Sequence, residues 1–225
     1  MAETRARGGG CGCVGALALI AALAGAIVFV VTTHGAFVGL STRPVVAADI
    51  RRIDITDLIR QSRAIAVGAN SHARLTGAVA RGARAGLVDA SEVNAADVTY
   101  EYRYADPAKP AGRTIVAGSI AIAVYLGSFA VIQTTLPGSV EPEYVDGDAL
   151  AGCTSQAAWQ AAVRSGIPAG GPATIRLENG RGRDARRPPR SGGASSGPVW
   201  TVTTLTPDER RRDVDARTCS VMAGL

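Results

Sequence analysis

The sequence predicts an α+β protein with an N-terminal transmembrane helix, extended by a long Ala-rich helix and followed by a small antiparallel sheet with short helices. Three observations predict this class. Residues 14–31 are eighteen consecutive residues without a charge, apolar residues recur at helical spacing between 48 and 88, and residues 97–104 alternate as a strand does. The predicted organisation is a cytoplasmic N-tail (1–13), a transmembrane signal anchor (14–40), an extracytoplasmic α+β domain (41–178), a mobile loop rich in Arg, Gly, Ser and Pro (179–198), and a C-terminal strand and short helix that return to the domain (199–225).

The N-terminal apolar segment reads VGALALIAALAGAIVFVV, and the uncharged stretch continues to Arg43. A helix needs about 20 apolar residues to cross the hydrocarbon core, and basic residues favour the cytoplasmic side, where Arg5 and Arg7 would lie. The alternative is a signal peptide cleaved near Ala24. Cleavage there would leave the apolar GAIVFVV at the new N-terminus, which favours an uncleaved anchor.

The segment between 48 and 88 has two apolar stripes of helical spacing. Leu75, Val79, Ala83 and Leu87 recur every four residues, which is typical of one helix face. Glycines within this segment would let another backbone approach closely. Two interpretations stay open: a helix packed on its own sheet, or one packed laterally against copies or membrane partners.

Residues 115–132 are also uncharged and read IVAGSIAIAVYLGSFAVI. Their β-branched residues, and a short loop back to the strand at 97–104, favour one long bent strand or two short strands. Their length equally allows a second membrane span. That alternative gives a two-pass protein whose cytoplasmic basic tail binds a partner or anionic lipid.

The C-terminal third alternates short elements. A helix is predicted over 154–166, and strands over 174–178 and 199–205. Thr206, Pro207 and Glu209 match a helix-capping pattern, which predicts a short helix that carries Arg210 to Arg212 and ends before Cys219.

The cysteines form two pairs in the sequence. Cys11 and Cys13 precede the apolar segment, whereas Cys153 and Cys219 lie far downstream. Outside the cytoplasm the downstream pair can form a structural disulfide; the alternative is two unrelated buried thiols.

Composition argues against common chemistries. Aromatic residues are 4% of the chain, His34 and His72 are its two histidines, and the formal net charge is +5. The densest basic run, 181–190, contains no aromatic residue, which disfavours nucleic-acid binding. The sequence lacks the common nucleophile, phosphate-loop and zinc motifs. We therefore predict a protein that is not an enzyme, with no catalytic, cofactor-binding or metal residues and no cofactor.

The organisation of the first half resembles a known family. The residues ARGGG precede GALALIAALAGAIVFVV, the segment GARAG (82–86) falls in the predicted helix, and DVTYEYRY and AIAVYL form the predicted strand pair. In these features the chain resembles the TadE/TadG-like minor pseudopilins of Tad (Flp) pilus assembly. The family expects an acidic residue near its processing site, and here none occurs between Glu3 and Asp49, so no site residue is carried over.

These features together predict a bacterial, non-enzymatic, single-pass protein of the cell membrane with an extracytoplasmic C-terminal domain. The resemblance implies a role in pilus assembly, with membrane or pilus-assembly partners contacted through the helix 48–88. A secreted or periplasmic ligand-binding domain is a third hypothesis.

Overall fold

The computed structural model describes residues 43–109, 114–136, 138, 141–180, 197–205 and 209–222. The chain divides at residue 37 into two parts, and every described residue belongs to the second part, Val38–Leu225. The predicted N-tail and signal anchor lie outside the described residues, as does most of the loop predicted at 179–198.

The described part is mostly an antiparallel sheet. Its elements, in chain order, are β1 (Arg43–Pro44), β2 (Ile53–Asp54), α2 (Ile55–Ala69), β3 (Arg74–Ala83), β4 (Leu87–Val88), β5 (Ala96–Ala105), β6 (Ile115–Tyr125), β7 (Ser128–Thr135), the 3₁₀ helix η2 (Asp148–Gly152), α3 (Ser155–Arg164), β8 (Ala173–Asn179), β9 (Pro198–Thr204) and β10 (Arg211–Asp215).

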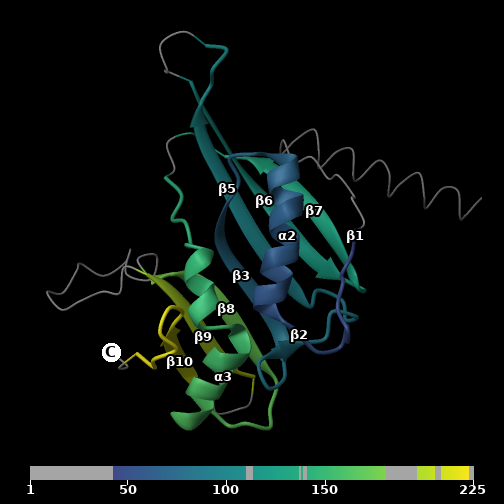
Figure 1. Ribbon diagram of the computed structural model, residues 1–225, viewed down its shortest axis with the longest axis vertical. Coiled ribbons are helices and arrows are strands. Elements are labelled where there is room, and N and C mark those ends of the chain that lie inside the picture. Colours follow the sequence, from purple (N-terminus) through teal and green to yellow (C-terminus); the bar gives the residue numbers. More distant parts are fainter. Residues whose placement is uncertain are drawn as a thin grey trace, which may run out of the picture. The chain divides into compact units, whose positions relative to one another are not determined.

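Eight of these strands form one sheet in the order β1-β7-β6-β5-β3-β8-β9-β10, and each neighbouring pair is antiparallel (Figure 1). β2 and β4 form a separate two-stranded sheet. The large sheet has two halves. In the first half α2 is followed by β3, β5, β6 and β7, and in the second half α3 is followed by β8, β9 and β10. Pairing of β3 with β8 joins the two halves at the centre of the sheet.

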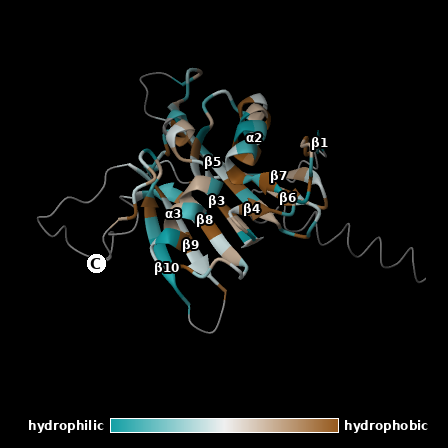
Figure 2. Cartoon of the chain, turned by 60° about the horizontal axis from the view of Figure 1, so that its bottom comes forward, coloured by the Kyte–Doolittle hydropathy of each residue, from teal (hydrophilic) through white to brown (hydrophobic). Residues whose placement is uncertain are grey.

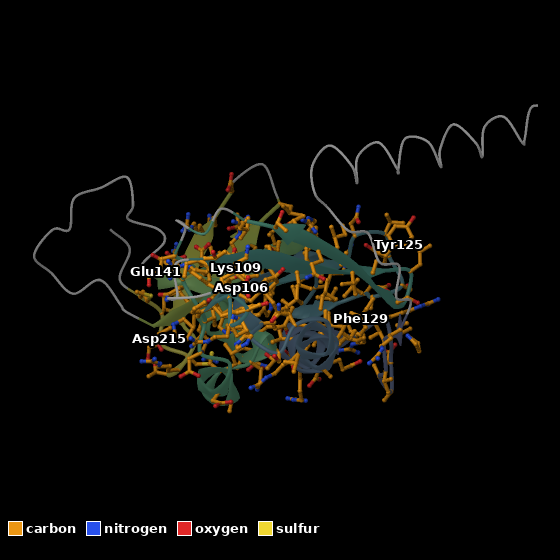
Figure 3. All side chains as sticks on the ribbon, turned by 90° about the horizontal axis from the view of Figure 1, so that it is seen from above. Asp106, Lys109, Tyr125, Phe129, Glu141 and Asp215 are labelled. Atoms are coloured by element: carbon orange, nitrogen blue, oxygen red, sulfur yellow. A yellow bond between two sulfur atoms is a disulfide. The ribbon has the colours of Figure 1, made fainter. Side chains whose placement is uncertain are left out.

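Both α-helices lie on the same side of the large sheet, as the view along it shows (Figure 3). The helix-facing residues of the strands form the core, and its largest fully buried side chains include Trp200, Tyr100 and Phe129. Many other core positions are alanine or valine. At the far edge, β10 is hydrophilic (Figure 2), and charged edge strands of this kind disfavour pairing with other chains.

The predicted strand at 97–104 is confirmed as β5, and the strand interpretation of 115–132 is confirmed as the hairpin of β6 and β7. Leu126 and Gly127 form the two-residue turn, with φ of 46° and 77°. This turn twists with the strands it joins, so the chain reverses tightly. The alternative of a second membrane-spanning helix at 115–132 is therefore wrong, because this segment forms two strands.

The α+β class predicted from the sequence is wrong, because it expects too much helix and too small a sheet. The long Ala-rich helix expected over 48–88 is not present. Only Ile55–Ala69 is helical there, and the chain continues as β3 and β4. A spacing of four also fits a strand, because four is a multiple of the strand period of two. Gly82, Ala85 and Gly86 have positive φ, which a helix interior does not accommodate.

The short helix predicted after Pro207 is also wrong. Residues Arg211–Asp215 form β10, which pairs along its whole length with β9. The capping pattern is a local signal, whereas the exposed edge of β9 offers backbone hydrogen bonds to the returning chain. The segment also lacks an apolar stripe that would hold a helix against the sheet. The helix predicted over 154–166 is confirmed as α3, with Thr154 as its N-cap.

Among the described residues, no helix combines the length and the apolar character that crossing a membrane requires.

Candidate binding cleft

The structure brings Cys153 and Cys219 together and joins them in a disulfide, with their Cα atoms 5.2 Å apart. The bond ties the chain just before α3 to the segment after β10. The Cys153 carbonyl also accepts a hydrogen bond from Trp200 Nε1 at 2.9 Å, deep in the core. Closing a loop with a sequence separation of 66 is worth about 4 kcal/mol in the chain-entropy treatment.

Asp54 holds the first turns of both α-helices. Its Oδ1 accepts hydrogen bonds from Thr56 N at 2.8 Å and Ser155 Oγ at 2.8 Å, and its Oδ2 accepts one from Gln156 N at 3.1 Å. Burial raises the pKa of this carboxyl, but the hydrogen bonds from Thr56, Gln156 and Ser155 outweigh burial and lower the pKa. The role of Asp54 is therefore to cap α2 and to accept hydrogen bonds from the start of α3, whose N-cap is Thr154.

A cleft of about 560 Å³ opens beside α2 on the helix side of the sheet; we call it the α2 cleft. Its floor is apolar and includes Ile59, Leu75 and Leu150. Its walls come from α2, the start of β3, β5 and the segment before α3. The remaining lining residues are Thr56, Arg60, Arg63, Ala73, Arg74, Tyr100, Val145, Asp146, Gly147, Asp148 and Ala151.

Three arginines surround the α2 cleft, and each has a neighbour. Arg60 Nη1 lies 2.6 Å from Asp57 Oδ1, and Arg63 Nη1 lies 4.0 Å from Asp148 Oδ1. The Arg74 guanidinium lies 4.2 Å from the centre of the Tyr144 ring. The two ion pairs are largely exposed, so solvent screens them and the guanidinium groups stay available to a ligand.

Tyr100 forms the inner end of the α2 cleft. Its hydroxyl donates to the Ile59 carbonyl at 2.9 Å and lies 2.9 Å from Ser62 Oγ. Burial raises the pKa of Tyr100 to about 12, so the phenol stays neutral at physiological pH. A neutral phenol, protonated arginines and exposed aspartates can bind a ligand, but they do not constitute a nucleophile activated by a base.

A second hollow, of about 630 Å³, lies on the other face of the sheet, over β8 to β10. Threonine hydroxyls and charged side chains of both signs line it. The charged residues are Arg176, Glu178, Glu209 and Arg211. Thr201 Oγ1 is buried there without a hydrogen-bond partner. Because basic and acidic groups alternate in this hollow, it offers no field of one sign to a charged ligand.

The remaining residues considered in the sequence do not join a site. His72 stacks on the ring of Tyr104, with centroids 4.3 Å apart, and His34 lies outside the described residues. In the described ranges, no three His, Cys, Asp or Glu side chains are grouped as a metal ion requires.

Sequence reasoning missed both Asp54 and the α2 cleft. Asp54, followed by Asp57, is a recognisable helix start, but the helix was expected to begin earlier. The cleft joins segments about 90 residues apart, so no local pattern could show it. The chain matches no family model, no curated protein and no solved structure.

Proposed function

We propose that the chain is a non-enzymatic, single-pass membrane-anchored protein of the cell envelope, whose folded domain lies outside the cytoplasm and acts by binding. The observation that carries this proposal is the disulfide between Cys153 and Cys219. Disulfides persist in oxidising compartments and are rare in the cytosol. The apolar segment 14–40, which precedes the domain in the sequence, supplies the anchor.

The α2 cleft supports a binding role. It combines an apolar floor with arginine side chains at its rim, and its buried hydroxyl is fully hydrogen-bonded within the core. Because Asp146 and Asp148 also line the cleft, such a site suits a ligand with an apolar body and polar groups that can pair with both arginine and aspartate.

A role in pilus assembly stays a prediction from the sequence alone. The partner surface expected on a helix 48–88 does not exist in that form. The apolar face of α2, which includes Ile55, Leu58 and Ile65, is buried in the domain's own core.

Thiol labelling in intact cells tests the proposal. The full chain with Cys11→Ser and Cys13→Ser leaves Cys153 and Cys219 as the reporters. With a membrane-impermeant maleimide, we expect no labelling before an impermeant reductant is added and labelling of Cys219 afterwards, because Cys219 is partly exposed whereas Cys153 is buried. The additional Cys153→Ser change should expose Cys219 to the reagent in intact cells without reductant.

The opposite results would overturn the proposal. Labelling that requires cell lysis would place the domain in the cytoplasm, as in the two-pass alternative. Release of the chain from membranes by alkaline carbonate would show that residues 14–40 are not an anchor.

A further inference from the structure

Exposed apolar side chains gather at one end of the sheet, at the corner where the described chain begins. Val46 is 74% exposed, Leu126 58%, Val93 56% and Tyr125 44%. We call these four residues the entry corner. Tyr125 lies on the face of the sheet away from the helices, whereas Phe129 points to the helix side (Figure 3).

Backbone hydrogen bonds tie the three loops of the entry corner together. Val45 N donates to the Gly127 carbonyl at 2.8 Å, and Gly127 N donates to the Ala90 carbonyl at 2.7 Å. Leu126 N donates to the Glu92 carbonyl at 3.3 Å. These bonds hold the three loops together at this end of the sheet, and the Gln61 side chain of α2 hydrogen-bonds the backbone of Val46.

Leu126 is an unusual residue for its position. It occupies the first place of the β6–β7 turn with φ of 46°, where asparagine, aspartate or glycine is preferred. A leucine there strains the backbone and leaves most of its side chain in water. Neither effect stabilises the domain, which points to a contact outside it.

The charges around the entry corner balance. Three arginines and three acidic residues lie in the same loops: Arg43, Arg51, Arg52, Asp49, Asp89 and Glu92. A contact made here would depend on apolar burial and not on attraction to an anionic surface.

Chain length limits where this corner can lie. The predicted anchor ends at residue 40, and Arg43 already pairs with Phe129 in the sheet. Three residues span at most about 11 Å, and one headgroup layer is about 5–8 Å thick. If the membrane-spanning helix extends to residue 40, Arg43 and the entry corner beside it lie close to the membrane surface.

We propose that the entry corner inserts its apolar side chains into the interfacial region of the bilayer and so fixes how the domain rests on the membrane. Aliphatic side chains and tyrosine are suited to this layer. The inference rests on the proposed membrane anchor and adds the orientation of the domain to it.

Depth-dependent quenching in vesicles tests the proposal on the full chain. With Cys11→Ser and Cys13→Ser as background, an environment-sensitive fluorophore is attached at Leu126→Cys. The matched control is Val67→Cys on α2, where the native side chain is 43% exposed. In zwitterionic vesicles that contain a lipid spin-labelled near the headgroup, we expect at least threefold stronger quenching at position 126 than at position 67. The difference should persist in 0.5 M salt.

Several results would overturn the inference. Equal quenching at the two positions would show that the corner stays in water. Loss of the difference in high salt would indicate an electrostatic contact. A difference that disappears when the protein is diluted in lipid would indicate a contact between two copies. Failure of the chain to remain with the vesicles after alkaline extraction would instead refute the anchor, so the two proposals fail separately.

Discussion

The hydrogen bonds of Asp54 to the starts of α2 and α3 allow a quantitative prediction. Asp54→Ala removes the N-cap of α2, worth about 1 kcal/mol, and leaves the backbone N–H of Gln156 without its acceptor, which costs about 1–3 kcal/mol. The Ser155 hydroxyl keeps the Gly86 carbonyl as an acceptor. We expect a total loss of about 3 kcal/mol in the free energy of unfolding. Asp54→Asn should lose roughly half of that, because one amide oxygen remains while the NH₂ group faces the backbone N–H of Gln156.

The pH dependence of the free energy of unfolding tests the same role of Asp54. The pKa of Asp54 is lowered in the folded domain, so protonation favours the unfolded chain. Its stabilising contribution is complete above the pKa of an unfolded aspartate, about 3.9, and is lost as the pH falls through the folded-state value. The side-chain amide of the Asp54→Asn variant cannot titrate, so the stability gap between this variant and the wild type should narrow below about pH 4.

Thermal unfolding of the detergent-solubilised full chain at pH 7 and pH 3, followed by circular dichroism, measures both effects. The control is Asp57→Asn, which removes an exposed ion pair one turn away and should change stability by less than about 1 kcal/mol. An Asp54→Asn variant that unfolds with the wild type at pH 7, or a stability gap that is equal at both pH values, would refute the capping role.

Four further changes test the packing of the domain, each by thermal or denaturant unfolding. Reduction, or the pair Cys153→Ala and Cys219→Ala, should lower stability by about 2–5 kcal/mol; an unchanged midpoint under reductant would contradict this. Gly86→Ala should destabilise by about 2–3 kcal/mol, because φ is +81° and the new Cβ would lie 2.7 Å from a backbone atom of α3. Gly68→Ala, which meets nothing within 4 Å, should stabilise by about 0.5–1 kcal/mol; equal effects of the two glycine changes would refute the close approach at Gly86. Tyr100→Phe should cost about 1 kcal/mol and leave the disulfide formed.

The sequence predicted best where the signal was local. Alternation in DVTYEYRY identified β5, and the cap at Thr154 with Gly166 identified α3. The spacing of Leu75 and Val79 was ambiguous, because it suits both a helix face and a strand face. A bulge between Leu75 and Gly77 then placed Leu75 and Val79 on opposite faces of β3, which no spacing rule could reveal.

The balance between helix and sheet depended on contacts distant in the sequence. Pairing of β3 with β8 brings residues near 78 against residues near 177, and it commits the glycine-rich segment after α2 to a strand. The α2 cleft depends on the same long-range arrangement, as does the contact of Gly86 with the start of α3.

The position of the disulfide also sets how the protein would respond to a pulling force. The first and last strands of the large sheet, β1 and β10, form its two opposite edges, so tension between Arg43 and Met222 would load the sheet from both sides. The 66-residue separation closed by Cys153 and Cys219 could not be extended, and it would hide about 220 Å of contour length. Single-molecule stretching should therefore show a short extension under oxidising conditions and regain that length after reduction.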